Sequence, residues 1–139
     1  MIKMDQRGQI SIEFVLVIAF MLVIVILVGS YASEQNEISS ITAAARTGAT
    51  DAITIIAITN KNLNPTRINE IRMNGSGQNL TLLLNISGPI SIEANRTVFN
   101  ATIQSMAKVG NYGINTNNNT NLFDDVVVTG RHNYGVIIV

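Results

Sequence analysis

An unbroken apolar run near the N-terminus dominates the hydrophobic pattern of the chain. Every residue from 14 to 28 is apolar, and no Asp, Glu, Lys or Arg occurs from residue 14 to residue 33. About 20 such residues allow an α-helix to cross the hydrocarbon core of a bilayer. Lys3 and Arg7 precede the run, and basic residues favour the cytoplasmic side of a membrane. The pattern predicts a membrane-spanning helix with a cytoplasmic N-terminus.

The pattern changes after this run, but it predicts that the helix continues. Small and apolar residues recur at the three- and four-residue spacing of one helical face. These positions are Ile38, Ile41, Ala45, Gly48, Ala52, Ile55 and Thr59. The first proline is Pro65, so we expect one helix over residues 10–58, about 75 Å long at 1.5 Å per residue. Gly29 and Gly48 within it mark bends, close helix contacts or tolerated small residues.

The second half of the chain has the short, turn-separated apolar segments of a β domain. Asn and Pro at residues 60–65 end the helix. We expect strands over residues 67–74, 80–87, 90–94, 97–106, 123–129 and 134–139. The apolar C-terminal residues 136–139 predict an interior strand, because an exposed apolar edge invites aggregation. The expected fold class is α+β, in which a long N-terminal helix protrudes from and packs on a small antiparallel sheet.

The apolar run by itself has three interpretations. An ordinary secretory signal peptide would be cleaved near residues 29–32, but its apolar region would then have to contain Glu13. A permanent single-span anchor would keep the whole segment. In the third interpretation, a short leader is cut off before the run, and the run stays on the mature chain.

A motif directly before the run favours the third interpretation. Residues 7–14 read Arg-Gly-Gln-Ile-Ser-Ile-Glu-Phe. They resemble the class III signal peptide of archaeal type IV pilins, especially those of methanogens, in which a membrane peptidase cuts between Gly and Gln of a Gln-x-Ser-x-Glu pattern. The resemblance covers residues 1 to about 35. Archaellins share the export route but usually lack this pattern, so the motif favours a pilin.

The resemblance implies a role for each residue of the motif. The cut falls between Gly8 and Gln9, and Gln9, Ser11 and Glu13 act in assembly. Glu13 has two interpretations: an interfacial carboxylate favoured by the helix dipole, or a partner for the new amino group of Gln9 on its own or a neighbouring subunit. The implied partners are a prepilin peptidase, membrane-embedded assembly machinery and further copies of the chain.

The motif and the hydropathy pattern together predict the organisation and function of the chain. We expect four segments: a removed leader (1–8), a membrane and filament-core helix (9–33), an amphipathic continuation (34–59) and an extracellular β-rich domain (60–139). The precursor is expected in the membrane, and the mature chain in an extracellular type IV pilus-like filament that serves adhesion or surface attachment. The alternative is a membrane-anchored cell-surface binding module, or a minor pilin or pseudopilin outside the main filament.

Composition narrows the classes of function. Nine Lys and Arg residues balance nine Asp and Glu residues, which argues against a nucleic-acid partner. The absence of Cys removes disulfides, thiolate metal sites and Cys nucleophiles. His132 is the sole His and is expected to be solvated, while Asp124 and Asp125 would point to opposite faces of a strand. We therefore expect no enzyme activity, no metal site and no cofactor.

The sequon Asn-x-Ser/Thr recurs after residue 73. It occurs six times, where a composition of 17 Asn and 21 Ser and Thr residues gives about two or three by chance. The sequon is the acceptor signal for N-glycosylation on exported surfaces. The candidate acceptors are Asn74, Asn79, Asn85, Asn95, Asn100 and Asn118. Composition bias in an Asn-, Ser- and Thr-rich domain is the alternative explanation.

Overall fold

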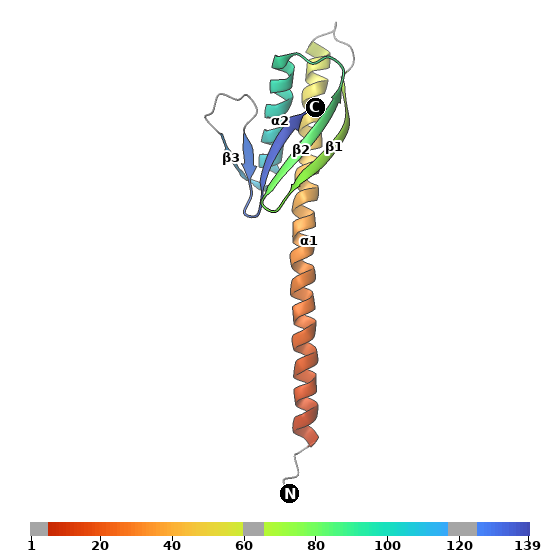
Figure 1. Ribbon diagram of the computed structural model, residues 1–139, viewed down its shortest axis with the longest axis vertical. Helices are drawn as coiled ribbons and strands as arrows, with labels where there is room; N and C mark the ends of the chain where they lie inside the picture. Colours follow the sequence, from red (N-terminus) through yellow and green to blue (C-terminus); the bar gives the residue numbers. More distant parts are fainter. Residues whose placement is uncertain (1–5, 60–65, 117–124) are drawn as a thin grey trace. The chain divides into compact units, whose positions relative to one another are not determined.

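The described part of the chain folds into two helices and five strands, whose arrangement is drawn in Figure 1. The computed structural model describes residues 6–59, 66–116 and 125–139, with side chains from residue 12 onward. The elements are α1 (Gln6–Thr59), β1 (Arg67–Ser76), β2 (Asn79–Ser87), α2 (Ile92–Gly110), β3 (Gly113–Asn115), β4 (Val126–Val128) and β5 (Asn133–Ile138). The chain divides into unit 1, Met1–Ile38, and unit 2, Ser39–Val139. The α+β class and the long N-terminal helix agree with the expectation from the sequence.

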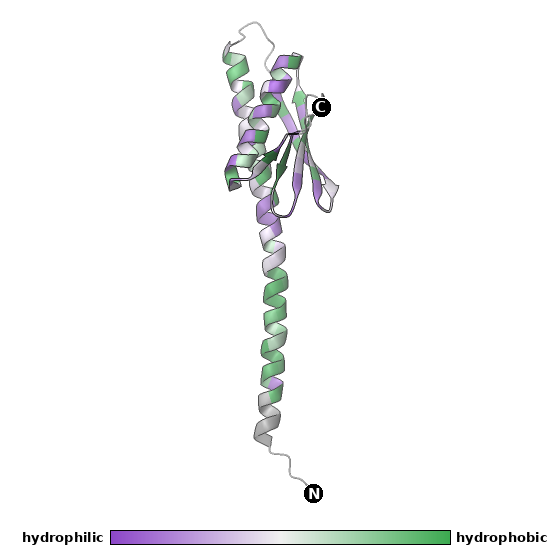
Figure 2. Ribbon diagram, turned by 90° about the vertical axis from the view of Figure 1, so that its left-hand side faces the viewer, coloured by the Kyte–Doolittle hydropathy of each residue, from purple (hydrophilic) through white to green (hydrophobic). Residues whose placement is uncertain are grey.

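Unit 2 consists of a helical layer on one face of a sheet. Residues 39–59 of α1 lie beside α2 in both ribbon views (Figures 1 and 2). The strand order is β1-β2-β5-β4-β3, and β2 pairs with β5 in parallel while the other pairs are antiparallel. The sheet is therefore mixed, whereas the sequence analysis predicted an antiparallel sheet. Parallel strands need a crossover connection, and here the chain forms α2, β3 and β4 between β2 and β5.

Residues 92–110 form the helix α2, so the strands expected over 90–94 and 97–106 are wrong. Ser91 caps the helix, because its Oγ accepts a hydrogen bond from the backbone N–H of Ala94 at 3.2 Å. Asn111 ends the helix in the left-handed conformation, with φ 53°. Its buried side chains recur at helical spacing: Ala94, Val98, Phe99, Thr102, Ile103, Met106 and Ala107. The burial of one amphipathic face outweighs the strand preference of the β-branched residues in this segment.

Strand β5 lies in the interior of the sheet, as expected for the apolar C-terminus. Tyr134 and Val136 are 0% and 2% exposed, and they pair with Leu80 and Leu82 of β2. The strands expected over residues 67–74 and 80–87 are present as β1 and β2, which form a hairpin around residues 75–77 and pair from Ser76 and Asn79 onward. The sheet thus buries one face of its central strands against the helices.

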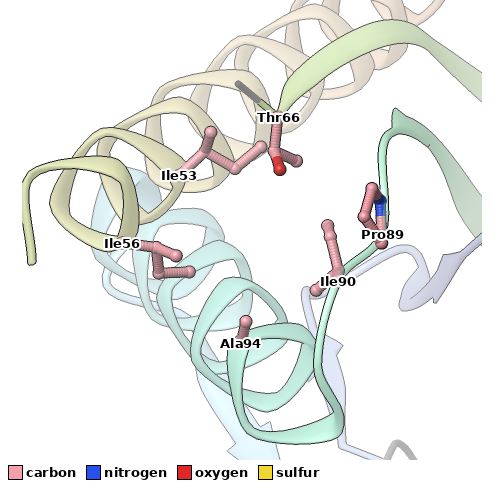
Figure 3. Close-up of a pocket in the computed structure, with 6 residues that line it drawn as sticks. All are labelled: Ile53, Ile56, Thr66, Pro89, Ile90 and Ala94. Atoms are coloured by element: carbon pink, nitrogen blue, oxygen red, sulfur yellow. The ribbon is translucent and has the colours of Figure 1, made fainter. Parts of the chain in front are cut away.

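The part of α1 in unit 2 buries a helical stripe that differs at its end from the expected one. Ile41, Ala45, Gly48 and Ala52 are buried as expected, but Ile55 is 61% exposed. The stripe turns because the last turns of α1 meet new neighbours, which are Pro89 and Ile90 of the loop before α2 and Thr66 directly before β1. Figure 3 shows this apolar pocket, which is lined by Ile53, Ile56, Thr66, Pro89, Ile90 and Ala94.

Candidate functional site

Among the described residues, α1 exposes a long continuous series of large apolar side chains. Its segment Ile12–Thr59 contains a span that is long and apolar enough to cross a membrane, as in a membrane anchor or a signal sequence. Every described side chain from residue 12 to residue 36 is exposed. The large apolar side chains of the run are between 40% (Ile24) and 68% (Phe20) exposed. Figure 2 shows the apolar colouring along this length of the helix.

This surface is apolar all round the helix, so it has no polar face for water. A helix with such a surface is stable only when lipid or other helices surround it. The exposed surface therefore suits a bilayer or a bundle of several helices. Residues 14–28 supply no group for chemistry, since all of them are aliphatic, aromatic or methionine side chains.

Glu13 lies at the start of the exposed apolar run, and its side chain is exposed. Because α1 begins at Gln6 and has no acidic residue in its first turn, Glu13 lies about two turns inside the helix of the uncut chain. The helix dipole acts within the first turn, so it would favour Glu13 only after a cut near Gln9. The structure describes only the backbone helix at Gly8, Gln9 and Ser11, so the implied cleavage before Gln9 and the pairing of Gln9 with Glu13 stay predictions.

The sequon asparagines lie on two surfaces of unit 2. Asn74, Asn79 and Asn85 are exposed positions of the β1–β2 hairpin. They point away from the helical layer, since the alternate positions Leu80, Leu82 and Leu84 of β2 are buried. Asn95 and Asn100 belong to α2. Asn118 lies outside the described residues.

A close helix crossing leaves an open trough on the surface of unit 2. A Cβ atom added to Gly48 would lie 2.6 Å from the backbone O of Ala101 and 2.7 Å from Cβ of Ser105, so only glycine fits. The trough has a volume of about 770 Å³ and is lined mainly by small and polar side chains: Ser40, Ala43, Ala44, Thr47, Asp51, Ser105, Lys108 and Val109. Of the three roles left open for Gly48, the structure selects a close helix contact.

His132 is only 9% exposed, so the expectation of a solvated loop side chain is wrong. Its Nδ1 lies 3.5 Å from the hydroxyl of Tyr134. Thr129 shapes the turn, since its Oγ1 accepts hydrogen bonds from the backbone N–H groups of Arg131 and His132 at 3.2 and 2.9 Å. The turn buries the imidazole as part of the core. One residue in the sequence could have indicated this turn: Thr129, three residues before His132, is of a type whose hydroxyl can close such a turn.

Within the described part of the chain, no group of three or more His, Asp and Glu side chains is placed to hold a metal ion. On the edge strand β1, the hydrogen bond and charge of Glu70 raise the pKa of Arg72, and the Nε–Oε1 distance of this exposed pair is 2.7 Å.

Comparisons of the chain with protein-family models, with curated proteins and with solved structures found no match.

Proposed function

We propose that the protein is a pilin, the structural subunit of an archaeal type IV pilus-like extracellular filament. The observation that carries the proposal is the exposed apolar surface of residues 14–28 on α1, directly preceded by the Gln-x-Ser-x-Glu motif of residues 9–13. The proposed role is structural and not catalytic. The filament serves adhesion or attachment to a surface.

The same apolar helix serves two stages of this function. Before assembly, lipid surrounds the run and holds the precursor in the membrane with its N-terminus in the cytoplasm. After the cut before Gln9, copies of the same helix surround one another in the filament core. Because lipid is as apolar as the run itself, the helix gains little by leaving the bilayer. Extraction therefore requires the membrane-embedded assembly machinery, and the peptidase that removes residues 1–8 must act first.

The mature chain is expected to begin at Gln9, with or without cyclisation of its N-terminal glutamine. The measurement is the intact mass and N-terminal peptide of protein isolated from its native host. A chain that begins at Met1 would support a permanent anchor, and one that begins near residue 33 an ordinary signal peptide. Either result contradicts the proposed processing.

Loss of the charge at Glu13 is expected to reduce filament formation while membrane insertion continues. Glu13→Gln preserves the size of the side chain and removes no apolar surface, so the span remains intact. If Glu13 pairs with the Gln9 amine in the filament, removing one partner of a buried ion pair costs about 3–5 kcal/mol. Filament yield should fall by more than tenfold, measured as sheared filaments against total membrane protein.

The matched control for this test is Glu13→Asp, which keeps the charge and should retain more filaments than Glu13→Gln. Equal filament yields for the unchanged protein and Glu13→Gln would refute the pairing with the Gln9 amine. That result would leave the pilin proposal standing, because the apolar surface is unchanged.

A membrane-anchored binding module is the second candidate function. It is favoured by the fact that α1 alone is long enough to anchor unit 2 in a bilayer. The two functions differ in one result. If the chain is cut before Gln9 and never appears in filaments alongside its native partners, the anchored module or a minor subunit replaces the filament subunit.

A further inference from the structure

The five sequons in the described part of the chain fall into two classes that differ in backbone conformation. Three belong to the extended β1–β2 hairpin, and two belong to α2. A sequon has two chemical groups, the amide of Asn and the hydroxyl two residues later. The backbone conformation decides whether both groups reach the same surface.

In the hairpin, residues two apart point to the same face of the sheet. Each acceptor amide and its hydroxyl therefore share the face opposite the helical layer. All three asparagines are exposed, and their hydroxyl partners are exposed or half-buried. The three pairs are Asn74 with Ser76, Asn79 with Thr81, and Asn85 with Ser87.

In α2, residues two apart point to nearly opposite sides of the helix, because each residue turns the helix by about 100°. Asn95 is half-buried with its Oδ1 fully buried, while Thr97 is exposed. Asn100 is exposed, but Thr102 is 0% exposed and its Oγ1 donates a hydrogen bond to the backbone O of Val98 at 2.7 Å. Neither sequon of α2 presents both of its groups on one surface.

The hydrogen bonds of the hairpin asparagines also orient their amides. Oδ1 of Asn74 accepts a hydrogen bond from the backbone N–H of Gly75 at 2.9 Å. Oδ1 of Asn79 accepts from Nδ2 of Asn133 at 3.0 Å. Oδ1 of Asn85 faces Nδ2 of Asn69 at 3.5 Å. In each of these three contacts the amide atom involved is the oxygen and not the nitrogen.

We propose that the outer face of the sheet is a glycan-bearing face, with Asn74, Asn79 and Asn85 as the acceptors, and that Asn95 and Asn100 stay unmodified. The co-reactant is a sugar activated as a phosphate ester of a lipid carrier, delivered by a membrane-bound transferase. Nδ2 forms a bond to the anomeric carbon of the sugar, and the bond from that carbon to the phosphate oxygen breaks. The lipid phosphate leaves with the electron pair, and the amide loses one proton.

The attached sugars would cover surface that otherwise invites association. The outer face exposes Ile137 and Val139 of the C-terminal strand at 51% and 68%, and Leu83 of β2 pairs with Ile137. Strand β1 forms the edge of the sheet, where unpaired backbone groups can pair with another chain. Glycans on the hairpin shield both features, so the outer face is excluded from contacts between subunits. This inference rests on the export of unit 2, which is part of the proposed function.

A double digest can separate the two classes of sequon in protein from the native host. Cleavage after Glu93, Arg72, Arg96 and Lys108 gives one peptide of residues 73–93 with the three hairpin sequons. It gives separate peptides, 94–96 and 97–108, for the two sequons of α2. The expected result is three glycans on peptide 73–93, placed on the three asparagines by fragmentation, and no sugar on the other two peptides. A bare peptide 73–93, or a sugar on peptide 94–96 or 97–108, overturns the proposal.

Hydroxyl variants provide matched controls for the same digest. Thr81→Ala should remove one glycan mass from peptide 73–93, whereas Thr81→Ser should keep it. Thr97→Ala, at an exposed position of α2, should leave the glycan mass of the whole protein unchanged; a loss of mass there overturns the proposal. The N-terminal peptide of the same sample separates the two proposals: a chain that begins at Gln9 with bare hairpin sequons refutes the glycan-bearing face and leaves the pilin standing.

Discussion

A Val23→Asp substitution is expected to abolish filaments and to lower membrane retention of the protein. Val23 lies within the apolar run of α1, and its side chain is 54% exposed. A carboxylate near the centre of a membrane helix costs about 2.5–3.5 kcal/mol on insertion scales, which corresponds to a change of roughly a hundredfold in the insertion equilibrium. In a filament core the same carboxylate would be buried among neighbouring helices without a partner. The measurement is the amount of protein in the membrane fraction and in sheared filaments.

Two controls separate the effect of position from the effect of charge. Val23→Leu keeps the apolar surface and should assemble normally. Thr54→Asp adds the same charge at an exposed position of α1 in unit 2 and should leave membrane retention unchanged. Normal filaments from Val23→Asp would mean that the run is not buried in the assembled state, which contradicts a filament core made of this helix.

The N-terminal half of α1 could be predicted from the sequence because an unbroken apolar run of this length is compatible with few structures other than an exposed apolar helix. Residues 14–28 contain no polar position, so no register or partner had to be known to recognise an exposed apolar helix. The strands β1 and β2 could also be predicted from the sequence, because two glycines separate them. Gly75 and Gly77 adopt the positive φ values, 124° and 67°, that a tight turn needs. In both cases local residues determine the local structure.

Helix α2 was misread because its local preferences conflict with its packing. Thr97, Val98 and Thr102 favour strands, and Gly88 and Pro89 before the helix are residues typical of the turns that separate strands. The buried positions nevertheless recur every three or four residues, and Ser91 supplies an N-cap. The parallel pairing of β2 with β5 follows from α2, because only a crossover brings the C-terminal strand beside β2 in that direction. Because α2 was predicted as two strands, the crossover was missed and the sheet was predicted as antiparallel.

The candidate sites needed the structure for a different reason. All six sequons are alike in sequence, and the contrast between Asn79 and Asn100 appears only when strand and helix are distinguished. The burial of His132 depends on a turn closed by Thr129 and on its contact with Tyr134. Such contacts depend on tertiary packing, which a pattern of residue types does not specify.

Replacing Gly48 with Leu is expected to destabilise unit 2 by about 2 kcal/mol, starting from an overpacking cost of about 3 kcal/mol at the upper end of the usual range. The new side chain would begin 2.6 Å from the backbone O of Ala101, and a helix backbone cannot move aside as a flexible side chain can. The gain of about 1 kcal/mol in helix propensity over glycine offsets only part of this cost. The measurement is amide hydrogen exchange of β2 and β5 in the full-length protein in detergent. It should become roughly thirtyfold faster where exchange requires global unfolding.

Gly29→Leu is the matched control, because it makes the same chemical change in the same helix. No atom lies within 4 Å of a Cβ built on Gly29, so the larger side chain meets no neighbour there. The exchange of the β2 and β5 amides should stay as in the unchanged protein. Equal exchange rates in the two variants would show that α1 and α2 do not pack closely at Gly48. A protected sheet in Gly29→Leu together with a fast-exchanging sheet in Gly48→Leu would instead mean that the crossing at Gly48, formed by residues 39–59 of α1, holds the globular unit together. In that case the second part of α1 serves the stability of unit 2, while the first part is left to the role in membrane and filament that we propose for it.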